Sequence, residues 1–421
     1  MELGVIGAGY VGLTTAACFA HLGHRVVCAD IDAAHVERLS AGDVGIAEPG
    51  LTELVVSGLE SGRLRFVTEP VAAVDADIVF ICVGTPPDSD GAADLSAIKS
   101  VVRTIAPVLR RDAVLVTKST VPVGSAQMVN SLIPERDDIA VVSNPEFLRE
   151  GHAVDDFLEP SRVVVGGDIP AARARVADLY TDLQAPVLVT DPASAELVKY
   201  ATNAFLATKI SFANAIANVC EAVGADIRQV GLGMGHDPRI GFDHLEAGPG
   251  FGGSCLPKDV SALLHFAREA GYDFALLRGV LEVNDEQRAR VVTKVRALAG
   301  GDLGGVSIGV LGLAFKAGTD DLRDSPALAV VASLVAEGAA VKAFDPAVDA
   351  VDLPISVVKD PYEAARNAAV LVVLTEWAEF RSVDYERVAT EMKHAVVVDA
   401  RNLLNPDTMR RQGFEYVGVG R

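Results

Sequence analysis

The stretch "LGVIGAGYVGL", residues 3–13, decides the fold of the first part of the chain. A short apolar run breaks into glycines and then continues with helical spacing, which predicts a strand, a tight turn and a helix. Gly7 permits the turn, Gly9 lets the backbone approach a pyrophosphate, and Gly12 lets the helix pack close to the strand. The start of the helix then faces the phosphates of a dinucleotide.

The next apolar run, "HRVVCADID" (24–32), supplies the second strand and ends in Asp30. A carboxylate at this place accepts hydrogen bonds from a ribose 2′-hydroxyl and repels a 2′-phosphate. The sequence therefore predicts NAD as the cofactor rather than NADP.

Further apolar runs alternate with helical patterns at 76–86, 112–120, 139–147, 161–167 and 185–190. Near-continuous apolar runs are typical of parallel strands buried on both faces, so we expect a doubly wound sheet. Several runs end in small polar residues, namely Thr85, Thr120 after Ser119, and Asn144 to Glu146. Each could be an ordinary turn or cap, but three such strand ends together favour a ligand cleft.

A long helical pattern begins at Pro192 and stops at Gly224. It is apolar nearly all round, which predicts burial on several sides and a subunit contact. Lys199 and Asn203 are spaced i, i+4 and share a face of this helix. Either they serve a ligand, or the lysine extends to solvent while the asparagine bonds another helix.

A second alternating unit begins at Gly304 and carries Gly309 and Gly312 without a third glycine in register. This unit thus lacks the full glycine motif of a dinucleotide site. It does place the cations Lys316, Arg323 and Arg401 near strand ends, where they could bind an anionic ligand such as a diphosphate. We expect an α/β chain with two Rossmann-like doubly wound domains joined by a long central helix. The expected domains are an NAD-binding domain (1–190), a helical central domain (191–300) and a second Rossmann-like domain for an anionic ligand such as a diphosphate (301–421).

The segment "GPGFGGSCLPKD" (248–259) sets one cysteine, Cys255, among glycines and before a helical pattern. The helix N-terminus and Lys258 both favour the thiolate form, and Asp259 could act as a base through water. The alternative is a tight turn with an incidental cysteine. The other cysteines lie in apolar runs and are expected to be small core residues; they are Cys18, Cys28, Cys82 and Cys220.

The composition of the 421 residues narrows the function further. A formal net charge of -20 argues against nucleic acid and anionic membranes as partners. No apolar run approaches the length of a bilayer span, and no basic leader with a cleavage site is present, so we expect a cytoplasmic enzyme. The five scattered cysteines form no C-x-x-C pair, which indicates neither a metal site nor a disulfide framework.

A thiolate beside a nicotinamide cofactor suggests a particular chemistry. Oxidising an alcohol to a ketone needs no nucleophile, whereas oxidising a primary alcohol to an acid can use one. The thiolate adds to the intermediate aldehyde, the adduct is oxidised to a thioester, and water releases the acid. Lys199 and Asn203 could stabilise the oxyanion, and Glu146 could be the base for hydrolysis.

The motifs resemble the UDP-glucose 6-dehydrogenases, within the NAD-dependent nucleotide-sugar dehydrogenases. The match includes "GAGYVGL", "EPGL", "CVGTPP", "KSTVPVG", "NPEFLREG", "AELVKYATNAFLATKISFANAIA", "DPRIG", "GPGFGGSCLPKD" and "GLAFKAGTDDLRDSP", in order along nearly the whole chain. The resemblance implies Cys255 as nucleophile, Lys199 and Asn203 as oxyanion and substrate pair, Asp259 as a water-holding acid/base residue, Glu146 as hydrolysis base and Thr120 as partner of the reacting water. For NAD it implies Val11, Asp30, Thr85, Thr120, Glu150, Lys258 and Arg323, and for the UDP-sugar it implies Phe147, Leu148, His244, Leu245, Gly248, Gly252, Phe315, Lys316 and Arg401.

The resemblance also implies a homodimer built on the long helix, in which Arg239 of one subunit reaches the substrate of the other. His35 departs from the family pattern, since many relatives carry a cation there, and the loop "FDHLEAG" also differs. GDP-mannose is the alternative substrate, followed by UDP-N-acetylmannosamine, whose branch usually lacks the "CLPKD" run. Two other readings are a sensor that binds NAD or a nucleotide sugar without turnover, and a one-step dehydrogenase of small hydroxy acids in which Cys255 is structural.

Overall fold

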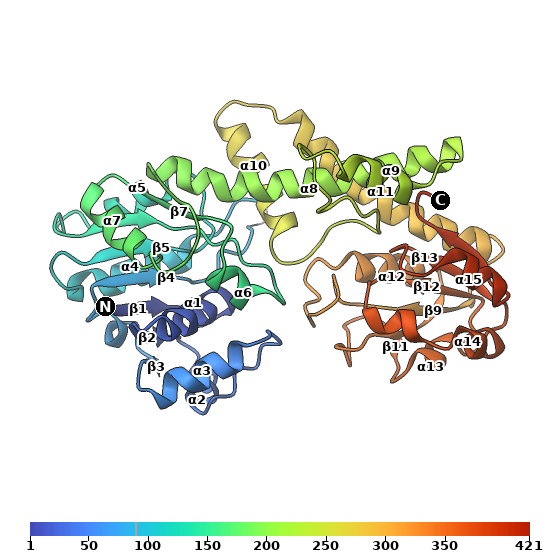
Figure 1. The fold of residues 1–421 in the computed structure, drawn as a ribbon, viewed down its shortest axis with the longest axis horizontal. Helices are drawn as coiled ribbons and strands as arrows, with labels where there is room; N and C mark the ends of the chain where they lie inside the picture. Colours follow the sequence, from blue (N-terminus) through green and yellow to red (C-terminus); the bar gives the residue numbers. More distant parts are fainter. Residues whose placement is uncertain (89–90) are drawn as a thin grey trace. The chain divides into compact units, whose positions relative to one another are not determined.

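The structure, a computed structural model, describes residues 1–88 and 91–421, which fold as two compact units (Figure 1). The first unit contains Met1–Thr202 with Ser261–Glu269, and the second contains Asn203–Val260 with Ala270–Arg421. Each unit is built around its own sheet and hydrophobic core. The division of the chain at residues 190 and 300 into three domains stays a prediction.

The first unit holds an eight-stranded sheet in the order β3-β2-β1-β4-β5-β6-β7-β8. Its first six strands are parallel and have the order of a dinucleotide-binding fold. Leu3 of β1 pairs with Val26 of β2 on one side and Ile78 of β4 on the other. The strands are β1 (Glu2–Ile6), β2 (Arg25–Ala29), β3 (Leu64–Val67), β4 (Ile78–Ile81), β5 (Val114–Thr117), β6 (Ala140–Ser143), β7 (Val163–Gly167) and β8 (Val187–Thr190).

Helices cover both faces of this sheet, which explains the continuous apolar runs of its central strands. In β4, Ile78 and Phe80 enter one hydrophobic cluster while Val79 and Ile81 enter another, because successive side chains point to opposite faces. The helix α1 packs against α3 and α6 (Figure 1). The helices of this unit are α1 (Tyr10–His21), α2 (Ala33–Ser40), α3 (Leu51–Glu60), α4 (Ser96–Ile105), α5 (Ser125–Ser131), α6 (Ala153–Leu158) and α7 (Pro170–Asp178), with 3-10 turns at Pro70–Ala73 and Ala106–Val108.

The prediction of parallel strands buried on both faces is only partly right for the last two strands of this sheet, because β7 is buried but not parallel to β6, and β8 is parallel to β7 but not buried. β7 pairs with β6 antiparallel, and Leu188 and Val189 of the edge strand β8 are exposed. The connection from β6 to β7 contains α6, whose six residues rise only about 9 Å, and α6 packs on α1. Because no long helix returns the chain along the sheet, β7 runs back from the edge at which β6 ended.

The long central helix α8 spans Pro192–Val223, as predicted from Pro192 and Gly224. Asp191 starts it, since its carboxylate accepts a hydrogen bond of 2.8 Å from the backbone N–H of Ser194. Gly224 ends it in the left-handed conformation, with φ of 74°. The first unit includes the helix up to Thr202, and the second includes it from Asn203 onward.

The second unit holds a six-stranded parallel sheet in the order β11-β10-β9-β12-β13-β14, which repeats the strand order of a nucleotide-binding fold. Its strands are β9 (Ser307–Leu311), β10 (Ala340–Phe344), β11 (Ser356–Val357), β12 (Val370–Val373), β13 (Val396–Asp399) and β14 (Glu415–Gly418). The remaining helices are α9 (Ile227–Gly235), α10 (Leu256–Glu269, which the unit boundary divides), α11 (Ala275–Leu298), α12 (Pro326–Ala336), α13 (Pro361–Ala365), α14 (Tyr385–Glu391) and α15 (Pro406–Arg411), with a 3-10 turn at Ala378–Ser382. The predicted fold class is confirmed.

The two sheets have a similar glycine turn after their first strand, but they differ in the aspartate that follows the neighbouring strand. Gly7 after β1 and Gly312 after β9 have nearly the same φ, 97° and 98°. Asp30 follows β2 and stays partly exposed, whereas Asp345 follows β10 and is buried. One oxygen of Asp345 already accepts hydrogen bonds from the N–H groups of Leu313 and Ala314 and from the Trp377 indole. Asp345 is therefore engaged within the protein, unlike Asp30.

Among the helices formed by the described residues, none has the length and apolar composition that crossing a bilayer requires. Within the same residues, no three His, Cys, Asp or Glu side chains gather in a way that could hold a metal ion.

Candidate active site

The glycine turn between β1 and α1 is shaped to accept a dinucleotide. A Cβ on Gly12 would lie 1.8 Å from the carbonyl oxygen of Gly7, so only glycine lets α1 approach the strand this closely. A Cβ on Gly9 would meet no heavy atom of the protein within 4 Å. The backbone at Gly9 thus faces open space beside the start of α1, which fits a pyrophosphate.

Asp30 is positioned by this turn. Its carboxylate accepts hydrogen bonds from the N–H of Ala8 at 2.8 Å and from the N–H of Asp32 at 3.0 Å. The side chain is partly exposed at the end of β2 and keeps lone pairs for a ribose. His35, the departure from the family pattern, bonds the Ala8 carbonyl at 3.1 Å and lies 3.2 Å from Arg38. Arg38 thus supplies a cation at this corner that the sequence reading missed.

The carboxyl ends of β4, β5 and β6 gather further predicted residues of the first unit. Thr85 donates a hydrogen bond of 2.8 Å to the carbonyl of Thr120, which ties the loops after β4 and β5 together. Glu146 follows β6 and pairs with Lys199 of α8 at 2.8 Å. Both side chains of this pair are nearly buried, with 6% and 4% of their surface exposed. Val11 and Glu150, two further residues expected at NAD, are partly buried in the same unit.

The carboxylate of Glu146 is held in its ionised form. Burial by itself raises the pKa of Glu146, but the Lys199 ammonium, a hydrogen bond of 2.6 Å from the N–H of Leu148 and the charge of Lys118 outweigh it. The net pKa of Glu146 lies below its ordinary value. An ionised, buried carboxylate at a strand end can act as a general base.

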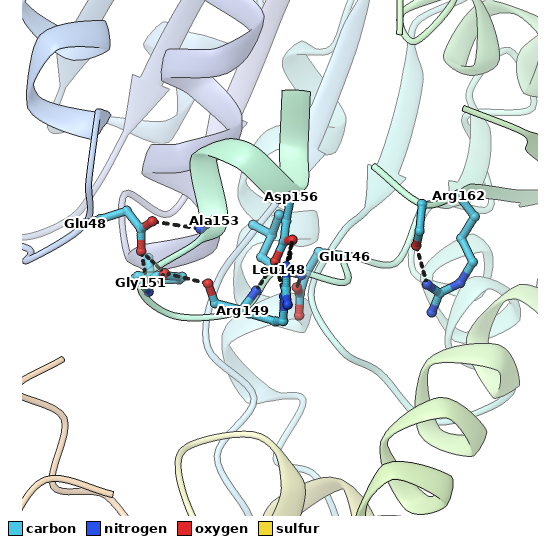
Figure 2. Close-up of polar contacts among 10 residues, drawn as sticks. Glu48, Glu146, Leu148, Arg149, Gly151, Ala153, Asp156 and Arg162 are labelled. Atoms are coloured by element: carbon cyan, nitrogen blue, oxygen red, sulfur yellow. Dashed lines mark hydrogen bonds and ion pairs between the residues drawn. The ribbon is translucent and has the colours of Figure 1, made fainter. Parts of the chain in front are cut away.

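The loop after Glu146 is held by polar contacts that the sequence reading did not identify (Figure 2). Glu48 accepts hydrogen bonds of 2.7 Å from the N–H groups of Gly151 and Ala153 and a short one from the Tyr10 hydroxyl. Arg149 forms an ion pair with Asp156 at 2.6 Å. The motif "EPGL", which contains Glu48, was the available signal, since a buried glutamate between a turn and a helix needs partners.

Phe147 and Leu148, both expected at the UDP-sugar, follow Glu146 on this loop. The Arg162 guanidinium stacks over the Phe147 ring at 3.7 Å from its centre, and Lys199 Nζ lies 5.6 Å from that centre. Arg162 also bonds the hydroxyl of Ser161 at 3.0 Å, a contact drawn in Figure 2. The Phe147 ring is therefore covered by the Arg162 guanidinium, while the nearby Lys199 ammonium is paired with Glu146.

Cys255 lies in the second unit, directly before the first residue of α10. It is partly exposed, whereas the other four cysteines are buried, as predicted. The Sγ atom lies 3.4 Å from the Ser254 hydroxyl oxygen. The Cys255 carbonyl accepts the N–H of Asp259 at 2.9 Å, which closes the first turn of the helix. The thiol thus belongs to a partly exposed residue at a helix start.

Asp259 joins two other predicted residues of the second unit. Its Oδ2 atom accepts a hydrogen bond of 2.6 Å from the Asn203 side chain, and its Oδ1 atom pairs with Lys258 Nζ at 2.6 Å. The Asp259 side chain is only 1% exposed, so its contact with Asn203 is buried, whereas its contact with Lys258, which is 18% exposed, is partly buried. The bond to Asp259 uses one N–H of the Asn203 amide, so its second N–H can donate to another partner.

The glycine segment before Cys255 packs against the loop after β9. A Cβ on Gly252 would lie 2.1 Å from the Asp324 carbonyl oxygen, and a Cβ on Gly253 would lie 2.7 Å from the Phe315 ring. The Arg401 guanidinium donates to the Phe315 carbonyl at 3.0 Å and lies close to Gly248. Phe315, Arg401 and the glycine segment, predicted separately as substrate-binding residues, therefore form one cluster.

Other predicted residues of the second unit lie on more exposed loops. Arg323 is 65% exposed and pairs with Asp321 at 2.6 Å, and Lys316 Nζ lies 5.6 Å from the centre of the Phe315 ring. Arg239 is 86% exposed and pairs with Asp237 at 2.5 Å. His244 has a φ of 64°, and Leu245 is buried beside it. Arg239 is thus available to a partner outside this subunit.

Three buried amide side chains hold the 248–251 segment, and the sequence reading missed them. Asn214 accepts the N–H of Gly248 at 2.8 Å, and Gln287 donates to the Gly248 carbonyl at 2.9 Å. Asn284 bonds both the N–H and the carbonyl of Phe251, at 2.8 and 3.1 Å. Amides within otherwise apolar helical patterns were the signal, because a buried amide needs partners.

The predicted residues thus form two groups, one in each compact unit. The first unit contains the glycine turn, Asp30, Thr85, Thr120, Glu146 to Glu150 and Lys199, and the second contains Asn203, Arg239, the 244–259 segment, Phe315, Lys316, Arg323 and Arg401.

Comparisons with known proteins identify the family of this chain. Residues 1–184 match the NAD binding domain of the UDP-glucose/GDP-mannose dehydrogenase family, residues 193–286 its central domain, and residues 309–406 its UDP binding domain. The UDP-glucose 6-dehydrogenase of Rhizobium meliloti (strain 1021) is 47% identical over 100% of both chains. The UDP-glucose 6-dehydrogenase TuaD of Bacillus subtilis (strain 168) is 44% identical over 100% of this chain and 93% of its own.

A solved structure of a UDP-glucose dehydrogenase from Pyrobaculum islandicum superimposes with a TM-score of 0.92 at 39% identity. The superposition covers 99% of this chain and 97% of that one. Since the similarity extends through the glycine turn, the central helix and the second sheet, the chain belongs to the UDP-glucose/GDP-mannose dehydrogenase family.

Proposed function

We propose that this protein is an NAD-dependent UDP-glucose 6-dehydrogenase that oxidises the C6 alcohol of UDP-glucose twice, to UDP-glucuronate, through a covalent intermediate on Cys255. The main support for Cys255 as the nucleophile is that it alone among the five cysteines is not buried, and that it directly precedes α10. The named relatives and the family's NAD and UDP domains support the substrate and the cofactor. A cytoplasmic location remains a prediction from the sequence.

The residues present fit NAD, since the turn at Gly9 is open and Asp30 is partly exposed at the end of β2. Gly7, Gly9 and Gly12 would hold the pyrophosphate, and Asp30 would bond the ribose. When bound, NAD supplies the acceptor for one hydride in each of the two oxidations. The overall balance is one alcohol, two oxidised cofactors and one water giving one carboxylate, two reduced cofactors and three protons.

The chain itself supplies the covalent step. The Cys255 thiolate adds to the carbonyl carbon of the aldehyde and forms a C–S bond, which gives a thiohemiacetal. Loss of hydride from that carbon leaves a thioester. Lys199 and Asn203 would stabilise the oxyanion of the adduct by donating hydrogen bonds to it. Both side chains are buried, so these interactions gain strength from a low-dielectric surrounding.

Hydrolysis of the thioester needs a base and a positioned water. Glu146 would take a proton from the water, which attacks the carbonyl carbon and displaces the Cys255 thiolate. Its lowered pKa supports an ionised carboxylate at neutral pH. Thr120 would hold the same water, and Asp259 would keep Asn203 and a second water in place. These roles rest on the family resemblance and on the polar contacts within each unit.

The number of NADH molecules formed per sugar tests this function against its rivals. With limiting UDP-glucose and excess NAD, we expect two NADH per sugar and UDP-glucuronate as the product. A one-step dehydrogenase would give one NADH, and a sensor would give none. The same assay with GDP-mannose is the matched control. Faster turnover of GDP-mannose than of UDP-glucose would identify the protein as a GDP-mannose dehydrogenase instead.

We also propose that the protein is a homodimer built on α8. Five large apolar residues on α8 are exposed, namely Phe205 (65%), Phe212 (51%), Val219 (54%), Val223 (70%) and Leu197 (41%). The first three recur every seven residues, so they lie along one face of the helix. An exposed apolar stripe of this kind supports a helix-to-helix contact with a second copy. The exposed Arg239 would then reach the substrate of the partner subunit.

Mixed dimers test the role of Arg239 across the interface. The variants Cys255→Ser and Arg239→Ala should each be impaired alone, the first by stalling and the second by a higher KM for UDP-glucose. After refolding or co-expression of both chains, half of the dimers combine an intact Cys255 with an intact Arg239 from the partner. We expect recovery of about a quarter of wild-type activity, as a symmetric dimer requires.

The dimer surface provides the control for this experiment. Phe212→Asp should give monomers by analytical ultracentrifugation and abolish the recovery, whereas Phe212→Leu should keep the dimer. If mixed chains recover no activity while remaining dimeric, Arg239 acts within its own subunit or not at all.

A further inference from the structure

A buried lysine of the first unit, Lys118, has no role in the function described so far. It directly follows the last residue of β5 and is 4% exposed. Its ammonium donates to the side-chain carbonyl of Asn144 at 3.2 Å and to the Tyr180 hydroxyl at 3.3 Å. It also lies 5.7 Å from the centre of the Phe157 ring and 5.8 Å from that of Tyr180. Its hydrogen-bond partners are therefore both neutral.

A buried ammonium bonded to neutral oxygens is costly to keep charged. Burial lowers the pKa of Lys118 to about 8 from its usual 10.5. The charged form is disfavoured, although the neighbouring Cys82, Glu146 and Cys18 oppose this effect and Lys199 adds to it. A methionine would fill a similar volume in the core without a charge, so stability does not explain the lysine.

The partners of Lys118 connect it to Glu146. Asn144 forms three further hydrogen bonds. Its side chain accepts one from the Tyr180 hydroxyl at 2.6 Å and donates one to the Val164 carbonyl at 2.8 Å. Its backbone N–H donates to the Thr117 carbonyl at 2.9 Å. Only Pro145 separates Asn144 from Glu146. Fixing the Asn144 side chain therefore fixes the point from which the Glu146 carboxylate extends.

The charges around Glu146 give Lys118 a second effect. Lys199 contacts the Glu146 carboxylate directly at 2.8 Å, the N–H of Leu148 bonds its other oxygen at 2.6 Å, and the Lys118 charge also favours the ionised form. Cys82, at the end of β4, faces both Lys118 and Glu146, and burial raises its pKa to about 12, so it stays neutral. In the proposed mechanism Lys199 must turn its hydrogen bonds toward the oxyanion. Lys118 then still contributes a positive charge that favours the ionised form of Glu146.

We propose that Lys118 is a positioning residue for Glu146: its ammonium clamps Asn144 and its charge keeps the Glu146 carboxylate ionised while Lys199 serves the substrate. This inference rests on the proposed role of Glu146 as the base for thioester hydrolysis. It predicts that loss of the Lys118 charge slows the release of the acid at low pH and leaves the formation of the thioester largely intact.

The test compares pH profiles of three variants. Lys118→Met removes the charge and the donor, Lys118→Gln removes the charge but keeps a donor for Asn144, and Tyr180→Phe keeps the charge and removes one hydrogen bond to Asn144. In both Lys118 variants the acid limb of the kcat profile should move to higher pH, and the ratio of kcat at pH 6 to kcat at pH 8 should fall by roughly three- to tenfold. Tyr180→Phe should leave that ratio unchanged.

Intact-mass spectrometry during turnover gives a readout that a general packing defect would not produce. At pH 6 the Lys118 variants should accumulate protein acylated by the sugar on Cys255, with a burst of NADH followed by slow release of uronate. Unaltered pH profiles in both Lys118 variants, or an equal displacement in Tyr180→Phe, would overturn the inference. Absence of uronate from the wild-type protein would instead overturn the proposed function, and the inference with it.

Thermal unfolding tests whether Lys118 is buried as an ammonium group. The lowered pKa of Lys118 fixes the direction in which stability changes with pH. Between pH 8 and 10.5 the unfolded chain binds a proton at Lys118 that the folded chain has released, so the stability of the wild type should rise over this window. Lys118→Met lacks this contribution. The Tm of the wild type minus that of the variant should therefore increase from pH 8 to 10, and a constant difference would contradict the buried ammonium.

Discussion

Replacing Cys255 with serine should lower the rate of UDP-glucuronate formation by on the order of 10³-fold or more, because a hydroxyl at this position is a far weaker nucleophile than a thiolate. The variant retains the glycine turn, Asp30 and the Lys199–Glu146 pair, so binding of NAD and of UDP-glucose should persist. At best it should complete the first oxidation. The measurement is the ratio of NADH to sugar in single-turnover reactions, together with the identity of the sugar product.

A buried cysteine in the same unit is the matched control for this experiment. Cys220 is 3% exposed and packs in the core of the second unit. Cys220→Ser places a hydroxyl in that core, so it should lower Tm by introducing a poorly paired polar group. It should nevertheless keep two NADH per sugar. Full uronate production by Cys255→Ser would remove the covalent mechanism, even with the dehydrogenase assignment intact.

Alanine at Gly12 should lower both stability and NAD binding, whereas alanine at Gly9 should lower NAD binding alone. At Gly12 the new Cβ would lie 1.8 Å from a backbone oxygen, so α1 must move away from the sheet. We expect a loss of about 3 kcal/mol of stability, which corresponds to roughly 5–10 °C in Tm for a unit of this size, together with loss of NAD binding. The measurements are calorimetric unfolding and NAD titration.

Gly9→Ala is the matched variant, because its Cβ would meet no protein atom within 4 Å. The folded protein should keep its Tm, whereas the methyl group would occupy the space that the pyrophosphate needs. NAD affinity should fall by about ten- to a hundredfold, equivalent to about 1–3 kcal/mol of steric cost. Equal loss of stability in the two variants, or unchanged NAD affinity in Gly9→Ala, would contradict this assignment of the two glycines.

The chain order of elements could be predicted from the sequence because local patterns carry it. The run from Leu3 to Leu13 has a strand period, then glycines, then a helix period, and the structure places β1, the turn and α1 there. The bounds of α8 followed from Pro192 and Gly224, whose backbone preferences act within a single turn. Cys255 stood apart from the other cysteines by its glycine neighbours, and its partial exposure agrees.

The direction of β7 could not be predicted in this way. The sequence 161–167 is as apolar as its neighbours, and pairing direction depends on the path of the preceding connection. The short α6 packs on α1, which is distant in sequence, and this contact decides where the chain re-enters the sheet. A local pattern contains no information on such a contact, since the packing surface is supplied by another element.

The sequence by itself determined the two nucleotide-binding folds, the central helix and the identity of the residues able to react or to bind a ligand. Each of these depends on side-chain type and on spacing along a few turns of chain. Only the tertiary structure decided which side chains support those residues. Glu48 bonds the 151–153 loop, and Asn214, Asn284 and Gln287 bond the glycine segment. Lys118 bonds Asn144, two residues before Glu146. The physical reason is that a buried polar group is satisfied by whichever partner folding brings within hydrogen-bond distance, and those partners lie between 26 and 105 residues away in the chain.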